Sequence, residues 1–348
     1  ISKDDLFNIS YIYDTDRLFE KIFLSDDNQF IIAKSQVNAF SSLILKITSH
    51  DEDSKIFLSS IYFSQSDIVH CVNNIFIELN SVSINKITFK IDKKICEIKP
   101  INLIYSKLLK NINLSCCFEF IYSFKELNNL ITIITFSKHG NYQIYRLNKN
   151  NYCKLIKYGQ LDNSLNENKS RIIISCYFTK INLKKDKSIA IIHRYNNETN
   201  NVYIYSCKKM LFRNVTGIDF KLNRIEYCSK TNYFFLQSNN IIKVIESNYF
   251  LNNQVYDARF KDIMTFENNL IYFKIVNDVI IVSDQKSSIQ FYKYYLQNNN
   301  FEIDYIGGDI KNRQLIFIDI IDNTVIYQSL NKKIYFITFE NNKISFIK

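Results

Sequence analysis

Short stretches of alternating apolar and polar residues recur along the chain, and each follows a pair of small or polar residues. Alternation with a period of two places the apolar side chains on one face of a β-strand. Each unit therefore predicts a hairpin turn that leads into a strand. The pairs are Gly140-Asn141, Asn200-Asn201, Asn239-Asn240, Ser287-Ser288 and Lys332-Lys333, and the strands after them begin at Tyr142, Val202, Ile241, Ile289 and Ile334.

The spacing of these units indicates their arrangement. From residue 200 onwards they lie about 40 to 50 residues apart, the length that a four-stranded propeller blade requires. The longer interval before residue 200 contains the polar segment LDNSLNENKS (161–170), which we expect to be a loop insertion. Further segments such as NYFFLQS (232–238) and RQLIFIDI (313–320) are typical of strands. The pattern predicts an all-β fold, a WD40-like β-propeller of about seven four-stranded blades, with a β-sandwich or another all-β layout as the alternative.

Composition explains the unusual turns. The chain is 47% hydrophobic and 15% aromatic, so it has a large core to bury and is not disordered. Its 348 residues include only five glycines and one proline. Asparagine tolerates positive φ better than most residues with a side chain. Asparagine pairs are therefore predicted to form the turns.

Charge leaves two explanations open. The net charge of +10 suits a partner rich in phosphate or acidic side chains. Lysines scattered through a Lys- and Asn-rich chain give the same excess without nucleic acid. The most apolar region, residues 271–282, is interrupted by Lys274, Asn277 and Asp278, so no membrane span is expected. The first residues, ISKDDLFNIS, lack the pattern of a secretory signal, and the missing Met leaves open whether the chain starts further upstream.

Candidate chemistry is sparse. His70 and Cys71 are neighbours, but adjacent strand residues point to opposite faces and chelate a metal poorly. The eight cysteines form no Cys-x-x-Cys pair, and we expect reduced thiols in an intracellular protein. The pair Gly307-Gly308, in IGGDIKN, fits a strand-to-strand turn better than a phosphate loop. No catalytic residue, cofactor or metal is predicted.

The last third of the chain carries a specific resemblance. An apolar run ends in Ser283-Asp284, and the polar stretch QNNNFE (297–302) follows further along. From residue 278 to 339 the chain resembles the C-terminal propeller of the family that holds splicing factor 3b subunit 3, the large subunit of the cleavage and polyadenylation specificity factor, and the damaged-DNA-binding protein 1 adaptor. The chain has no Trp, and Arg313-Gln314 and Tyr327 stand where the family has Trp and Gly. The matching positions are Asp284, Ser288, Tyr294, Asp322, Thr324 and Ile334.

The resemblance implies a function and a set of partners. It implies a non-enzymatic scaffold of the spliceosomal splicing factor 3b complex, in the nucleus, bound to a helical-repeat subunit and small subunits. A cleavage and polyadenylation subunit or a cullin-ligase adaptor stays open, as does, more distantly, a propeller hydrolase with carboxylates or histidines at the central channel. The tyrosines and lysine of FYKYY (291–295) suit stacking on RNA, but core packing explains them more simply, so RNA contact is expected to be indirect.

The matching residues are expected to be structural. Asp284 ends a buried run, and we expect its carboxylate to accept hydrogen bonds from backbone N–H groups and Ser288 rather than to contact a partner. Residues 126–348 are predicted to form blades like those of the family's C-terminal propeller. Residues 1–125 are predicted to hold first blades or the end of a preceding propeller. Because the chain ends soon after Ile334, either further strands are missing or strands near the N-terminus close the ring.

Overall fold

The structure of the protein is a computed structural model. The side chains it describes lie, with gaps, between residues 120 and 308. It describes the backbone of residues 12–14, 19–24, 30–35, 42–50, 55–64, 67–72, 75–79, 84–90, 95–100, 102–104, 120–125, 130–147, 152–161, 172–182, 187–195, 200–252, 259–284, 289–309, 315–321, 324–329, 333–340 and 343–345.

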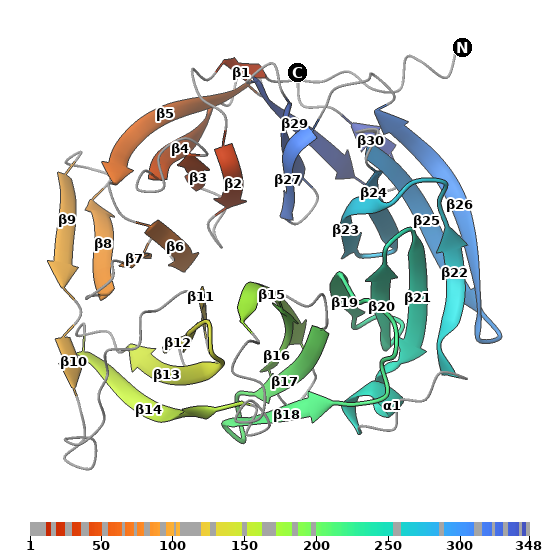
Figure 1. The fold of residues 1–348 in the computed structure, drawn as a ribbon. Coiled ribbons are helices and arrows are strands. Elements are labelled where there is room, and N and C mark those ends of the chain that lie inside the picture. Colours follow the sequence, from red (N-terminus) through yellow and green to blue (C-terminus); the bar gives the residue numbers. More distant parts are fainter. Residues whose placement is uncertain are drawn as a thin grey trace.

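The described strands form seven sheets arranged in a ring around a central axis (Figure 1). Blade 1 consists of β2 (Phe19–Leu24), β3 (Phe30–Ser35), β4 (Ser42–His50) and β5 (Lys55–Ser64), and blade 2 of β6 (Asp67–Val72), β7 (Ile75–Leu79), β8 (Ile84–Lys90) and β9 (Ile95–Pro100). Blade 3 consists of β11 (Phe120–Lys125), β12 (Ile131–Phe136), β13 (Asn141–Leu147) and β14 (Tyr152–Gln160), with β10 (Asn102–Ile104) parallel to β14.

The remaining blades continue the same meander. Blade 4 consists of β15 (Ile173–Asn182), β16 (Lys187–Tyr195), β17 (Asn200–Ser206) and β18 (Leu211–Val215), and blade 5 of β19 (Arg224–Cys228), β20 (Tyr233–Ser238), β21 (Ile241–Glu246) and β22 (Lys261–Thr265). Blade 6 consists of β23 (Leu270–Val276), β24 (Val279–Asp284), β25 (Ile289–Gln297) and β26 (Asn300–Asp309). The prediction of a β-propeller with four-stranded blades is confirmed.

Strands from both ends of the described chain build blade 7. It contains β27 (Leu315–Ile321), β28 (Thr324–Ser329) and β29 (Lys333–Glu340), with β30 (Lys343–Ser345) against the end of β29. The short strand β1 (Ile12–Asp14) pairs antiparallel with the start of β29, opposite residues 333–335. A strand near the N-terminus therefore joins the sheet that the last strands of the described chain form.

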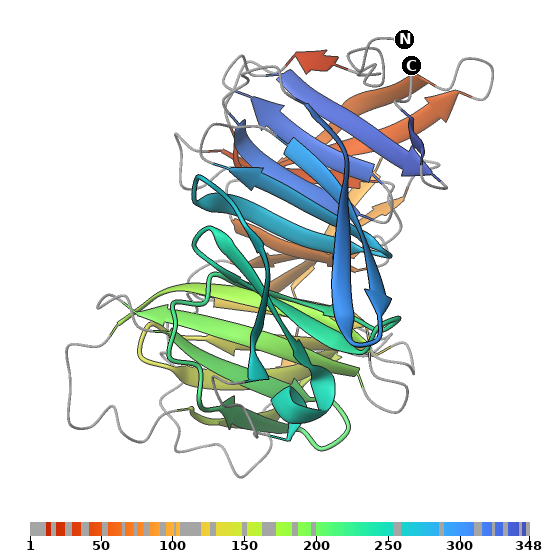
Figure 2. The same ribbon diagram turned by 90° about the vertical axis from the view of Figure 1, so that its right-hand side faces the viewer.

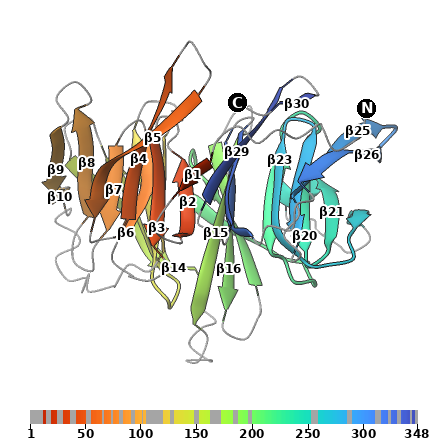
Figure 3. The same ribbon diagram turned by 90° about the horizontal axis from the view of Figure 1, so that it is seen from above.

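The described blades pack face to face, which is why the strands are so apolar (Figures 2 and 3). Between blades 4 and 5, a buried cluster includes Ile204, Phe234 and Phe250, the last from the short helix α1 (Ser247–Leu251). Between blades 5 and 6, Phe235 and Tyr294 lie in a second cluster. The predicted domain boundary between residues 125 and 126 falls between β11 and β12, which pair in one sheet.

Asparagines occupy most of the left-handed turn positions among the described residues. The non-glycine residues with positive φ are Met210, Asn232, Asn239, Asn277, Asn298 and Asn299. The predicted turns at Gly140-Asn141 and Asn239-Asn240 are confirmed, with φ of 77° at Gly140 and 51° at Asn239. Asn200-Asn201 instead begins β17, and Ser287, Ser288 and Lys332 lie outside the described residues.

The glycine pair corrects one prediction. Gly307 and Gly308 lie inside β26, opposite Phe291 and Gln290, and do not form a turn. The small residue is needed because a Cβ atom on Gly308 would lie 2.6 Å from the carbonyl oxygen of Ile289. The rest of the IGGDIKN segment, from residue 310, lies outside the described residues.

One irregularity recurs in the innermost strands. In five blades the strand nearest the axis carries a β-bulge near its start, where one residue has no partner in the pairing with the next strand. In each four-stranded meander the last strand ends at the rim where the next innermost strand begins. The bulges therefore lie at the same rim of the ring. The residues without a partner are Glu20, Val69, Ile174, Ile271 and Ile316.

Candidate functional site

Charged and aromatic side chains meet on the innermost strands of blades 4, 5 and 6. Strand β15 contacts β19, which in turn contacts β23, and all three face the axis (Figure 1). Together they hold what we call the axial cluster, which consists of Tyr177, Arg224, Glu226, Tyr272 and Lys274.

The carboxylate of this cluster is engaged by the chain itself. Glu226 is only 5% exposed, and its Oε1 accepts a hydrogen bond of 2.7 Å from the hydroxyl of Tyr177. The ammonium of Lys274 lies 3.8 Å from the same oxygen. Burial, and then the negative charge of Glu226, raise the pKa of Tyr177 to about 12, so its hydroxyl stays protonated and donates to the carboxylate.

Arg224 lies between two aromatic rings of the neighbouring blades. Its Cζ is 5.1 Å from the ring centre of Tyr177 and 4.5 Å from that of Tyr272. Both distances are in the range of a cation–π contact. Because the rings come from blades 4 and 6 while Arg224 belongs to blade 5, this contact ties three blades together next to the axis.

The three strands carry more positive than negative charge. Along β15, β19 and β23 the cations are Lys180, Arg224 and Lys274, and Glu226 is the one carboxylate. The carboxylate of Glu226 is already engaged by the hydroxyl of Tyr177 and the ammonium of Lys274. The surplus of cations instead suits the recognition of an acidic group.

The described residues also bear on metal binding, thiol chemistry and membrane insertion. They contain no group of three or more His, Cys, Asp or Glu side chains placed to hold a metal ion. Cys176, Cys207 and Cys228 form no disulfide bond. None of the helices described is long and apolar enough to span a membrane.

The residues picked out by the sequence resemblance lie elsewhere, in blades 6 and 7. Asp284 ends β24, is half-buried and accepts a hydrogen bond of 3.4 Å from the Nδ2 of Asn268. Thr324 begins β28 opposite Thr338, and Ile334 lies in β29 opposite Gln328. Ser288 and Asp322 lie outside the described residues, so the predicted bond between Asp284 and Ser288 stays a prediction.

Tyr294 is the member of this group with the most contacts described. It is 3% exposed in β25, and its hydroxyl lies 2.9 Å from the carbonyl oxygen of Asn277 and 3.0 Å from the sulfur of Cys228. Its backbone N–H donates to the carbonyl of Asp278. Burial and the Cys228 contact raise the pKa of Tyr294. The side chain thus joins the β23–β24 turn of blade 6 to blade 5.

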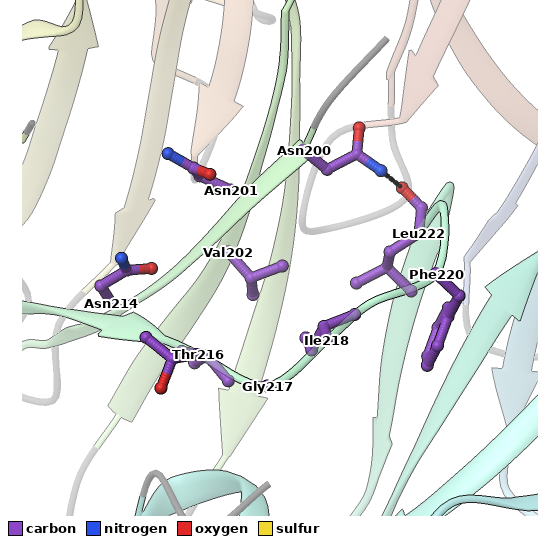
Figure 4. Close-up of a pocket in the computed structure, with 10 residues that line it drawn as sticks. Asn200, Asn201, Val202, Asn214, Thr216, Gly217, Ile218, Phe220 and Leu222 are labelled. Carbon is purple, nitrogen blue, oxygen red and sulfur yellow. Dashed lines mark hydrogen bonds between the residues drawn. The ribbon is translucent and has the colours of Figure 1, made fainter. Parts of the chain in front are cut away.

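A pocket of about 170 Å³ lies between β17 and the segment that leads from β18 to β19 (Figure 4). The Nδ2 of Asn200 donates a 2.8 Å hydrogen bond to the carbonyl of Leu222 and fixes this segment against β17. The pocket is smaller than typical ligand sites, which start at roughly 300 Å³. Its lining consists of neutral residues, Asn200, Asn201, Val202, Asn214, Val215, Thr216, Gly217, Ile218, Phe220 and Leu222.

The sequence pattern did not reveal the axial cluster. Its members come from three blades, about 50 residues apart, so no local motif joins them. The signal would have been a polar residue inside the first strand of consecutive blades. That signal becomes visible only when the innermost strand of each blade has been assigned.

Comparisons with known proteins agree on the fold. No protein-family profile and no curated protein matches the sequence. Among solved structures, the chain is similar to BBS1N in complex with ARL6DN (TM-score 0.56, 7% identity, 97% of this chain and 98% of that chain covered). It is also similar to virginiamycin B lyase from Staphylococcus aureus (0.54, 13%, 95% and 99%) and to BamB from Moraxella catarrhalis (0.50, 9%, 94% and 85%). With the ring of sheets, these likenesses define the chain as a β-propeller protein.

Proposed function

We propose that this propeller is a non-enzymatic scaffold that binds protein partners, and that it serves as a subunit of the splicing factor 3b complex in the nucleus. The observation that carries the scaffold proposal is the axial cluster. Its carboxylate is already engaged by Tyr177 and Lys274, whereas its cations outnumber it. Such a surface is suited to holding an acidic partner on a packed frame, where binding orders few additional groups.

Two further observations support the proposal at different levels. BBS1N, a structure with the same fold, is in complex with ARL6DN, so a ring of this kind serves as a protein-binding platform in that protein. The assignment to splicing factor 3b is drawn from the sequence resemblance between residues 278 and 339. Tyr294 and Asp284, which belong to it, contact other parts of blade 6 or blade 5, as expected of residues that maintain a scaffold.

Affinity capture of the tagged full chain from nuclear extract, followed by mass spectrometry, tests the proposal. Capture of a helical-repeat splicing factor 3b subunit with its small companions is the expected result. Capture of a cleavage and polyadenylation factor or of a cullin would support the scaffold function but overturn the splicing assignment. Capture of no protein, together with turnover of a small molecule by the purified chain, would overturn the scaffold.

A further inference from the structure

Two isoleucines on the innermost strands of blades 4 and 6 are exposed to solvent. Ile174 in β15 is 55% exposed and Ile271 in β23 is 43% exposed. Each is the residue without a partner in the bulge at the start of its strand. Bulges redirect side chains, and here they turn two isoleucines out of the packing between blades.

The strands of the two isoleucines, β15 and β23, flank the strand that begins with one cation, Arg224. Tyr272 follows Ile271 directly, and Tyr177 is three residues after Ile174. The rings of both tyrosines contact the guanidinium of Arg224, which begins β19, the innermost strand between them. We call Ile174, Arg224 and Ile271 the rim site, because all three lie at the starts of neighbouring innermost strands.

The apolar and charged side chains of the rim site indicate the chemistry of a partner. Burial of an exposed isoleucine gains about 1.5–3 kcal/mol when complete, so two half-exposed isoleucines offer a substantial gain to an apolar partner. Arg224 places a positive charge within the rim site, which favours negative charge beside it. Nucleic acid would satisfy the cations but would leave the isoleucines in water unless its bases stacked there.

We propose that the rim site binds an acidic segment of a protein partner in which apolar side chains alternate with carboxylates. One apolar side chain of the segment covers Ile174, another covers Ile271, and a carboxylate between them approaches Arg224. This inference rests on the proposed scaffold function and names the chemistry of one partner segment.

The first test measures binding of labelled peptides to the full chain by fluorescence anisotropy. The probes are a peptide that alternates Asp and Glu with Ile and Leu, the same peptide with Lys in place of every acid, and a single-stranded oligouridylate of equal length. We expect the acidic peptide alone to bind, with an affinity that falls as salt is added. Equal binding of both peptides, or preferred binding of the oligouridylate, would overturn the proposal.

Variants then locate the binding. Ile174→Ser with Ile271→Ser should weaken the acidic peptide about tenfold, equivalent to 1.4 kcal/mol, because both apolar contacts are lost. Arg224→Gln should weaken it and flatten its salt dependence. The matched control is Leu211→Ser on the outer strand β18, where Leu211 is 50% exposed, and it should leave the affinity unchanged. Equal weakening by the control would place the binding elsewhere.

The same variants separate this inference from the proposed function. The double isoleucine variant should stay folded, which circular dichroism checks, because both side chains are solvent-exposed in the parent. If it still captures all partners from nuclear extract and binds the acidic peptide as the parent does, the rim site is wrong and the scaffold stands. If the parent captures no protein, the scaffold itself fails.

Discussion

Adjacent tyrosines in β25 show how sharply environment decides the role of a residue. Tyr294 is buried at 3% exposure and contacts Asn277 and Cys228 through its hydroxyl, whereas Tyr295 is 38% exposed, with the ammonium of Lys293 5.3 Å from its ring centre. Tyr294→Phe removes the hydroxyl and leaves the carbonyl of Asn277 without that donor. We expect a loss of about 1–2 kcal/mol in the free energy of unfolding, measured by urea denaturation.

The neighbour provides the control. Tyr295→Phe removes an exposed hydroxyl and keeps the ring, so its effect should stay within about 0.5 kcal/mol. Equal losses in the two variants would show that the hydroxyl of Tyr294 does not join blades 5 and 6.

The raised pKa of Tyr177 predicts a pH dependence of stability. An unfolded tyrosine titrates near pH 10, whereas burial and Glu226 raise the pKa of Tyr177 to about 12 in the folded chain. The contribution of neutral Tyr177 to the free energy of unfolding is therefore fully present below pH 10. It is lost as the pH rises towards 12. At pH 8 the variant Tyr177→Phe should be less stable than the parent by about 1–2 kcal/mol, because the bond to Glu226 is lost.

The measurement is urea denaturation from pH 8 to pH 12, compared between the parent and Tyr177→Phe. The difference in the free energy of unfolding between the two chains should shrink between pH 10 and pH 12. Ultraviolet difference absorbance should detect one fewer tyrosine that titrates above pH 10 in the variant. A difference that stays constant across this range would contradict the assignment.

Asp284 is predicted to act on stability and not on partner binding. Its carboxylate accepts a hydrogen bond from Asn268, which belongs to the segment that leads into β23. Asp284→Ala should lower the melting temperature through a loss of about 1 kcal/mol, with partner affinity per folded molecule unchanged. Asn268→Ala, measured alone and with Asp284→Ala, completes a double-mutant cycle. Unchanged stability with weaker capture of partners would reverse the assignment.

At the scale of elements, the asparagine turns decide where hairpins form. Asn239 holds φ of 51° between β20 and β21, a conformation that costs most residues with a Cβ about 1 kcal/mol. Asn239→Ala should therefore destabilise the chain by about that amount, and Asn239→Gly should restore or exceed the parent stability. Thermal unfolding of both variants checks this. Equal effects of Ala and Gly would show that the turn conformation is not the cause.

Local patterns of turn residues and alternating strand residues determine how much of the fold the sequence predicts. The alternation in residues 241–244 and 142–145, with a turn before each, was enough to identify hairpins, and their spacing indicated blades. The pair Gly307-Gly308 predicts a turn, because glycine marks turns in most chains. Its actual reason is the close approach of the Ile289 backbone, a contact between strands that no local pattern contains.

The functional site is harder to predict for the same reason. Asp284 and Tyr294 lie in one short motif, so a single stretch of sequence is enough to identify them. Arg224 and Glu226 are single polar residues within one strand, and their partners lie in blades 4 and 6. Only the packing of one blade against the next brings these residues together.

At the scale of the whole molecule, the ring depends on how its first and last blades join. Blade 7 is the sheet that combines both ends of the described chain, through β1 and β29, while β2 of blade 1 contacts β27. The join lets each blade pack on two neighbours, because an open ring would expose the apolar faces of blades 1 and 7.

Removal of residues 1–14 should open this join. Without β1, residues 333–335 of β29 lose their antiparallel partner, and we expect the melting temperature to fall by several degrees, at about 2–4 °C for each kcal/mol lost. A synthetic peptide of residues 8–18, added in excess, should restore the melting temperature because it binds only the folded ring. The same peptide with Tyr13→Pro should fail, since proline disfavours strand pairing. A truncated chain as stable as the parent would show that β1 does not hold the ring together.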